Sequence, residues 1–277
     1  MSEHDFGQVD VFSAEPLRGN PVAVVHDAEG MSDEQMQAFA NWTNLSETTF
    51  LLPPTDPAAD YRVRIFTPST ELPFAGHPTL GTAHAWLEAG GEPRAEEQVV
   101  QECGVGLVRL RRARGRLAFA APPLLREGPV EEDQLATIAA GLRIPREEIV
   151  AARWVDNGPG WVGVLLPDAA AVLEVVPDPA VLGDLAVGIA GVYPEGDCAV
   201  EVRAFVGGFG IAEDPVTGSL NAGLAQWLAG DVLPASYVAS QGTVLGRRGR
   251  VHVETDVDGA IWVGGDTLTT VSGTVRI

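Results

Sequence analysis

Two short segments of the chain place polar side chains that could handle a proton at positions where the surrounding pattern is apolar. In the first, Ser46 and Glu47 stand directly before an apolar run, so a carboxylate is expected at the end of a strand. In the second, Gly76 and His77 stand between an expected strand and an expected helix. The reference pKa of histidine, about 6.5, suits a proton carrier or a substrate donor. Local capping of a strand or a helix is the alternative for both segments.

A third segment, GFGIAEDPVTGSLNAG (208–223), has the same organisation in the second half of the chain. Asp214 precedes a proline, and Gly218 and Ser219 stand at the expected start of a second helix. Serine is common at helix N-caps, so Ser219 could have a purely structural role. The free amides of a helix start and a hydroxyl also suit a substrate carboxylate. Both interpretations remain open on these residues alone.

Several other chemistries lack the residues that they need. All 18 basic residues are arginines, so neither a lysine Schiff base nor a P-loop lysine is available. The two cysteines lie 95 positions apart, and the five histidines lack the spacing of a zinc site, so no metal centre is expected. GGFG (207–210) lacks the strand–helix context of a dinucleotide fingerprint. A G-x-S-x-G nucleophile motif is also missing.

Charge and composition restrict the partners. The chain has 277 residues, 45% of them hydrophobic, and a formal net charge of −20. Such an acidic protein is not expected to bind nucleic acid or an anionic membrane. The sequence shows no export signal and no apolar run near the ~20 residues of a membrane span, so we expect a cytoplasmic protein.

The two halves of the chain repeat each other at a nearly constant offset. YRVRIF (61–66) and VEVRAF (200–205) are 139 residues apart, and the Trp-Leu pairs of HAWLEAG (84–90) and AQWLAGD (225–231) are 141 apart. We infer a duplication, in which each half contains strands, a helix, more strands, a second helix and a closing hairpin. The turn at Gly76 and His77 then corresponds to the turn at Gly218 and Ser219.

The duplication predicts two α/β domains of similar fold. The first is expected at 1–120 and the second at 121–265, with 121–150 as the connection between halves. The last strand (266–277) has no counterpart in the first half and is expected to cross back and complete the first domain. In the first half, Ser32 with Gln35 predicts a helix start, with Met36, Phe39 and Ala40 as its apolar face. The corresponding helix starts of the two halves are expected to face each other across a cleft.

The motifs together resemble the PhzF family of phenazine biosynthesis, which is related to diaminopimelate epimerase. The matching stretches are GNPVAVV (19–25), MQAFANWTNLSETTF (36–50), RIFTPSTELPFAGHPTLGTA (64–83), GIAEDPVTGS (210–219) and SQGTVLGR (240–247). Within them, SETTF, FAGHPTLG and EDPVTGS are the most specific motifs. The resemblance implies a diaminopimelate epimerase-like fold of two pseudo-symmetric α/β (α+β) domains, each with a curved mixed sheet around a central helix. It also implies a homodimeric, cofactor-free isomerase with its active site between the domains.

The family's namesake reaction moves a hydrogen from C3 to C1 of trans-2,3-dihydro-3-hydroxyanthranilate. Carried over by motif, Glu47 would take and redeliver the proton, and His77 and Asp214 would hold and polarise the substrate's amine and hydroxyl groups. Gly218 and Ser219 would bind the substrate carboxylate. Ser46 and Gly76 complete the expected substrate-binding residues. A carboxylate with this role needs a raised pKa, which a closed cleft would provide by desolvation.

Two further features of the sequence bear on the mechanism and on the substrate. Diaminopimelate epimerase uses thiols at the two turns, but 71–81 and 208–223 contain no cysteine, which contradicts a two-thiol racemase. The departure from the family's pattern is in two stretches that are only loosely like the namesake, WVDNGPGWVGVLL (154–166) and GRRGRV (246–251), so the substrate could be a related metabolite. Two alternatives remain: an epimerase with Glu47 and His77 as opposed bases, and a catalytically silent member that binds a metabolite or a protein.

Overall fold

The computed structural model describes residues 2–206 and 212–277, which divide into two units. The first unit comprises Met1–Ala120 and Gly264–Ile277, and the second comprises Ala121–Val263. The repeat in the sequence predicts the same fold in both units. Within the described residues, no helix is long and apolar enough to cross a membrane.

The first unit is a mixed sheet that curves around one helix. Its elements are β1 (Glu3–Val11), β2 (Asn20–Val25), α1 (Asp33–Thr43), β3 (Thr48–Leu52), β4 (Tyr61–Phe66), β5 (Glu71–Leu72), α2 (Gly76–Glu88), β6 (Gln98–Cys103), β7 (Gly106–Ala113), β8 (Arg116–Ala120) and β18 (Thr267–Arg276). The strands pair in the order β18–β1–β2–β3–β4–β6–β7–β8, and β5 adds to β4. The pairs β2–β3 and β4–β6 are parallel, and the others are antiparallel.

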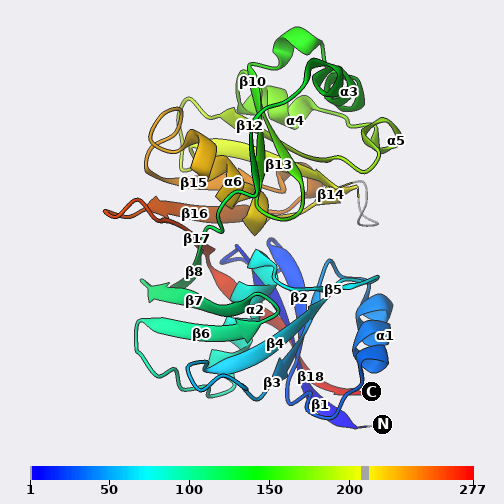
Figure 1. Ribbon diagram of the computed structural model, residues 1–277, viewed down its shortest axis with the longest axis vertical. Helices are drawn as coiled ribbons and strands as arrows, with labels where there is room; N and C mark the ends of the chain where they lie inside the picture. Colours follow the sequence, from blue (N-terminus) through cyan, green and yellow to red (C-terminus); the bar gives the residue numbers. More distant parts are fainter. Residues whose placement is uncertain (1, 207–211) are drawn as a thin grey trace. The chain divides into compact units, whose positions relative to one another are not determined.

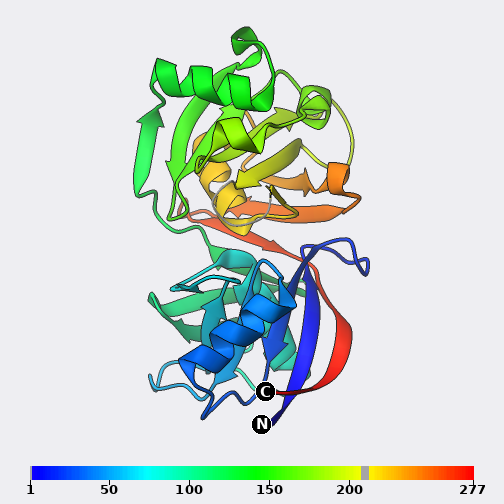
Figure 2. The same ribbon diagram turned by 90° about the vertical axis from the view of Figure 1, so that its right-hand side faces the viewer.

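The central helix of this unit is α2. It contacts β1, β2, β3, β6, β8 and β18, so the curved sheet surrounds it (Figures 1 and 2). Nine of the thirteen residues of α2 are buried, and most of these are small or apolar, so the helix packs closely inside the sheet. The C-terminal strand β18 pairs with β1 along its whole length and so closes this sheet beside the N-terminus.

The second unit repeats this architecture. Its elements are β9 (Arg126–Pro129), α3 (Glu132–Leu142), the short 3₁₀ helix η1 (Arg146–Glu148), β10 (Ala151–Asp156), β11 (Trp161–Leu165), α4 (Ala169–Glu174), α5 (Pro179–Leu182), β12 (Ala186–Val192), β13 (Val200–Val206), β14 (Glu213–Asp214), α6 (Gly218–Leu228), β15 (Ser236–Gln241), η3 (Thr243–Leu245), β16 (Gly249–Thr255) and β17 (Ile261–Gly265). The last of these, β17, runs across the boundary at Val263.

The strand pairing confirms the predicted duplication. In the second unit the order is β9–β10–β11–β12–β13–β15–β16, with β14 added to β13. The parallel pairs are β11–β12 and β13–β15, which occupy the places of β2–β3 and β4–β6. Helix α6 contacts β10, β11 and β16 and takes the place of α2.

The segment 121–150 is more than a connection, contrary to the expectation. It forms β9, which pairs with β10, and α3, which contributes Leu135, Ile138 and Leu142 to the core of the second unit. These residues repeat at the i, i+3, i+7 spacing of one helix face. The prolines and acidic residues that suggested a linker therefore flank a helix with a buried side.

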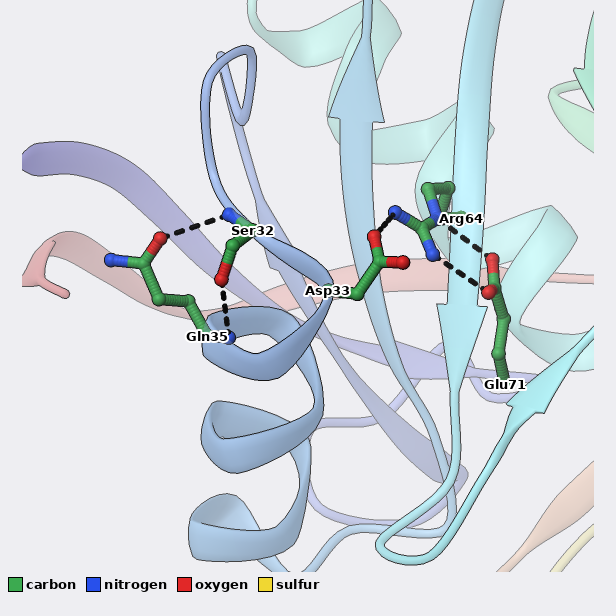
Figure 3. Close-up of polar contacts among 5 residues, drawn as sticks. All are labelled: Ser32, Asp33, Gln35, Arg64 and Glu71. Carbon is green, nitrogen blue, oxygen red and sulfur yellow. Dashed lines mark hydrogen bonds and ion pairs between the residues drawn. The ribbon is translucent and has the colours of Figure 1, made fainter.

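The predicted start of α1 is confirmed. The Ser32 hydroxyl accepts a hydrogen bond from the Gln35 amide at 3.3 Å, and the Gln35 side chain accepts one from the Ser32 amide at 2.9 Å (Figure 3). This capping box satisfies two amides that the first helical turn leaves without partners. Met36 and Ala40 are buried against β3 and β4, with Phe39 partly buried beside them. The helix thereby covers the outer face of the sheet and leads the chain into β3.

An arginine–glutamate pair occurs at the same place in both units. In the first, the Arg64 guanidinium donates to both carboxylate oxygens of Glu71, at 2.8 and 2.7 Å (Figure 3). In the second, Arg203 donates to both oxygens of Glu213, at 2.9 and 2.8 Å. Each arginine also lies 5.0 Å from a phenylalanine ring two residues further on. The two pairs link β4 to β5 and β13 to β14, directly before the turns that carry the candidate site residues.

Candidate active site

Glu47 lies between α1 and β3 in the first unit. Helix α1 ends at Asn44, whose φ of 54° is the left-handed conformation of a helix C-cap, and the chain then turns into β3. All five residues of β3 are buried, which fixes the strand and the residue before it. The Glu47 side chain is 15% exposed, and its Oε2 lies 3.4 Å from His77 Nδ1. The structure therefore brings together the two candidates that the sequence separates by thirty positions.

His77 is the second residue of α2 and only 5% exposed. Burial lowers the pKa of its imidazole from 6.5 to about 3, against the opposing influence of the Pro21 carbonyl. A carboxylate at 3.4 Å also favours the protonated ring, but desolvation of a fully enclosed cation outweighs it. The ring is therefore neutral at physiological pH, so it donates one hydrogen bond and accepts another rather than carrying a charge.

This burial predicts a specific pH dependence of stability. Between pH 3 and 6.5 the unfolded chain binds a proton at His77 that the folded chain does not. The free energy of unfolding is therefore unaffected by this group above pH 6.5, and it decreases as the pH is lowered from 6.5 towards 3. On lowering the pH from 7 to 5, the wild type should lose roughly 2 kcal/mol more than His77→Asn. Urea denaturation at both pH values measures the difference. His26→Asn is the control, because His26 is only partly buried and should give a smaller change; equal changes would contradict the assignment.

Gly76, the first residue of α2, allows a phenylalanine ring to lie against the helix start. A Cβ at this position would come within 2.6 Å of the Phe119 ring, and Phe119 in β8 is fully buried. Phe74 packs edge-on against the same ring, at 5.9 Å between centroids. The backbone of the turn before His77 is therefore held by close packing, and α2 begins without a side-chain cap.

Gly76→Ala is expected to lower the free energy of unfolding by about 1–3 kcal/mol, because the added methyl group must displace the buried Phe119 ring. Thermal or urea denaturation measures the loss. In a Phe119→Leu background the same substitution should cost clearly less, since the smaller side chain leaves room for the methyl group. An equal cost in both backgrounds would show that contact with this ring is not the cause.

Ser46 directly precedes Glu47 and is half-buried in the same turn. The first-unit candidates are thus gathered as a carboxylate, a neutral imidazole and the turn residues beside them.

In the second unit, Asp214 ends β14 and is linked to the start of α6. Its Oδ2 accepts a hydrogen bond from the Thr217 hydroxyl at 2.6 Å. The Thr217 amide donates to Gln241 Oε1 at 3.0 Å, and Gln241 Nε2 donates to the Thr217 hydroxyl and to the Asp214 carbonyl, at 2.9 and 3.2 Å. Asn221 donates to the same Gln241 oxygen at 2.9 Å. This mostly buried network fixes the turn that carries the Asp214 carboxylate.

Gly218 and Ser219 are the first two residues of α6, as Gly76 and His77 are of α2. The correspondence of the two turns, inferred from the repeat, is confirmed. Ser219 is half-buried, and its hydroxyl accepts a hydrogen bond from Trp161 Nε1 at 3.0 Å. The side chain of the N-cap residue Thr217 makes no capping hydrogen bond to α6, and the amides and the dipole at this helix start favour an anion. Residues 207–211 of the expected motif lie outside the described residues.

Sequence reasoning singled out Asp214, Gly218 and Ser219 but missed the residues that hold them. Thr217 lies in the EDPVTGS motif and Gln241 in the SQGTVLGR motif. The motifs contain both residues, but their presence does not by itself show that the two side chains are in contact. Asn157 and Trp161 lie in the stretch that departs from the family's pattern, and no local signal assigns them to α6. Their contacts depend on which strand the sheet places beside the helix.

Comparison with known proteins agrees with this architecture. The profile of the family described as "Phenazine biosynthesis-like protein" matches residues 9–274. The chain is 36% identical to Antisense-enhancing sequence 1 of Schizosaccharomyces pombe, over 99% of each chain. It is also 36% identical to trans-2,3-dihydro-3-hydroxyanthranilate isomerase of Pseudomonas aeruginosa, over 82% of this chain and 80% of that one. A solved PhzF-family structure from Enterococcus faecalis is 25% identical and superposes with a TM-score of 0.84 over all of both chains.

The matched region covers both units and every candidate residue of the two helix starts. The mixed α+β architecture agrees with the solved relative over its full length. The chain therefore belongs to the PhzF family of phenazine biosynthesis-like proteins, and it is an isomerase of that family.

Proposed function

We propose that this protein is a cofactor-independent isomerase that moves a carbon-bound proton by carboxylate acid–base catalysis. Its substrate is a small carboxylate-bearing molecule, trans-2,3-dihydro-3-hydroxyanthranilate or a related metabolite. The observation that carries the proposal is the position of Glu47 Oε2, 3.4 Å from the Nδ1 atom of a buried, neutral His77. The Glu47 carboxylate can accept a proton, and the neutral His77 imidazole can donate a hydrogen bond to it without competing for the substrate proton.

In this mechanism, Glu47 removes the proton from C3 of the ring and returns it at C1, after which the enol becomes a ketone. The same carboxylate serves as base in the first step and as acid in the second, so atoms and charge balance without a cofactor. His77 holds and polarises the substrate's amine or hydroxyl group, as the motif implies, and its low pKa keeps the ring neutral so that it does not protonate the substrate outright. Positioned dipoles of this kind stabilise charge that develops in the transition state.

The second-unit residues supply substrate binding. The start of α6 offers the amides of Gly218 and Ser219 together with the Ser219 hydroxyl, a donor set that suits a carboxylate. Asp214, fixed by the Thr217–Gln241 network, polarises the substrate's amine or hydroxyl group. Ser46 and Gly76 shape the turns beside Glu47 and His77.

The test is to incubate the protein with trans-2,3-dihydro-3-hydroxyanthranilate in D₂O and to follow the ring protons by NMR. We expect the C3 proton signal to disappear and a hydrogen to appear at C1. That hydrogen is deuterium in every turnover in which Glu47 exchanges with solvent before it returns the proton. Absence of any change would exclude this substrate, and a panel of related cyclic amino acids would then be screened by the same measurement.

An epimerase with Glu47 and His77 as opposed bases is the alternative. Two bases that act on opposite faces of one carbon must have that carbon between them, and 3.4 Å between their atoms is too short for this. The neutral, buried imidazole also counts against a second proton donor. Chiral chromatography of the product distinguishes the two: an epimer supports the alternative, and a shifted double bond supports the isomerase.

We also propose that the protein is a homodimer, as the family resemblance implies, and that it is cytoplasmic, as the sequence led us to expect. Light scattering should give twice the mass of one chain. A mass equal to one chain would contradict the dimer without bearing on the proton transfer.

A further inference from the structure

The turn between β10 and β11 lies against the first turn of α6, and it makes two hydrogen bonds to Ser219. Trp161 Nε1 donates to the Ser219 hydroxyl at 3.0 Å. Asn157 Nδ2 donates to the Ser219 carbonyl oxygen at 2.9 Å. All three residues belong to the second unit, so their geometry is fixed within one compact part of the chain.

The turn holds both side chains in place by its own backbone. Asp156 Oδ1 accepts hydrogen bonds from the amides of Gly158 and Gly160, both at 2.7 Å. The two glycines have φ values of 143° and 84°, which residues with a Cβ rarely adopt. The Trp161 side chain that follows is 2% exposed. The positions of Asn157 and Trp161 are therefore set by the turn before any ligand binds.

The hydrogen bond from Trp161 determines what the Ser219 hydroxyl can do. An indole N–H only donates, so the Ser219 oxygen must act as the acceptor of this bond. The hydroxyl keeps one proton of its own, and none of the hydrogen bonds among the described residues uses that proton. Ser219 is half-buried at the start of α6, so the proton is available to a ligand at this helix end.

Asn157 holds the backbone of the same helix turn. Because the Ser219 carbonyl can only accept, the amide nitrogen of Asn157 must face it. Trp161 and Asn157 together therefore hold the hydroxyl and the backbone of Ser219.

The first unit has a related contact at the same place. His77, the second residue of α2, interacts with the backbone carbonyl of Pro21 near the start of β2. Ser219, the second residue of α6, interacts with Trp161 at the start of β11. Strands β2 and β11 occupy the same place in the pairing orders of the two units, and each contacts the second residue of its central helix. The contact to Ser219 therefore follows from the duplicated framework.

We propose that the β10–β11 turn positions Ser219 for the carboxylate site at the start of α6. Trp161 is a positioning residue: its indole N–H holds the Ser219 oxygen and leaves the hydroxyl proton for a ligand carboxylate. The inference rests on the proposed function in taking the start of α6 as the carboxylate site, but it concerns binding rather than proton transfer.

The test measures binding of benzoate, a simple ring carboxylate, by calorimetry or NMR titration. Trp161→Phe and Ser219→Ala should each weaken benzoate binding by roughly tenfold, the value of one hydrogen bond to a charged group. The double variant should bind no more weakly than Ser219→Ala alone, because without the hydroxyl the indole has nothing to orient.

The proposal would be overturned by losses that add in the double variant or by unchanged binding of benzoate to Trp161→Phe. It would also be overturned by a wild type that does not bind benzoate at millimolar concentration. Because Trp161 is buried, its substitution could prevent folding. Tryptophan indole ¹H–¹⁵N resonances then serve instead: benzoate should shift one resonance in the wild type but not in Ser219→Ala. Absence of such a resonance would also overturn the proposal.

The outcomes separate this inference from the proposed function. If the losses of benzoate binding do not add but the protein does not isomerise the dihydroanthranilate, the inference stands and the proposed reaction is wrong. If the protein isomerises the substrate but the losses from Trp161→Phe and Ser219→Ala add, only the inference is wrong.

Discussion

Glu47→Gln is expected to reduce proton transfer on the substrate by about 10³- to 10⁴-fold, the upper range for loss of a general acid–base group. Glutamine keeps the size and shape of glutamate, but its amide cannot take a proton from carbon and return it. The contact with His77 Nδ1 at 3.4 Å can be kept by the amide oxygen, so the turn should retain its geometry. The decisive measurement follows both product formation and deuterium incorporation from D₂O by NMR.

The matched control for this substitution is Glu34→Gln. Glu34 is an exposed residue in the first turn of α1, and its replacement changes the net charge by the same amount. The control should keep wild-type turnover, and both variants should melt close to the wild-type temperature. Deuterium incorporation by Glu47→Gln at the wild-type rate would exclude this carboxylate as the proton carrier.

Arg203→Met is expected to destabilise the protein by about 3–5 kcal/mol, the usual cost of removing one partner of a buried ion pair. The side chains of Arg203 and Glu213 are 3% and 8% exposed, so the substitution leaves a buried carboxylate without its cation. Arg203 also donates to the carbonyls of Val172 and Val175, at 3.2 and 2.6 Å, and both would lose this donor. Because Glu213 adjoins Asp214 in β14, the loss also loosens the turn that carries the candidate carboxylate.

The duplication provides a matched control at Arg64, which makes the same two hydrogen bonds to Glu71 (Figure 3). There the side chains are 25% and 42% exposed, so solvent screens the charges and Arg64→Met should cost no more than about 1 kcal/mol. Urea denaturation of both variants gives the comparison. Joint replacement of Arg203 and Glu213 by apolar residues should recover part of the loss. Equal losses at the two arginines would contradict burial as the cause.

The repeat itself was visible in the sequence because strand and helix patterns depend on local periodicity. The spacing of the V-R-x-F and Trp-Leu motifs predicted two similar halves, and the pairing orders of the two sheets agree with this. The capping box at Ser32 and Gln35 was equally predictable, since a helix start needs only residues that are close in the chain. The role of 121–150 was misjudged, because polar flanking residues masked the buried face of α3.

The sequence by itself determined the chemical types that are available: a carboxylate, an imidazole and two glycine-containing helix starts, without lysine or a suitably placed thiol. Only the tertiary structure decided which of them meet. Parallel pairing of β2 with β3, and packing of α2 inside the curved sheet, bring Glu47 within 3.4 Å of His77, and burial there makes the imidazole neutral. Likewise, only strand order places Trp161 against Ser219. Contacts and desolvation depend on residues far apart in the chain, so neither could be inferred from local pattern.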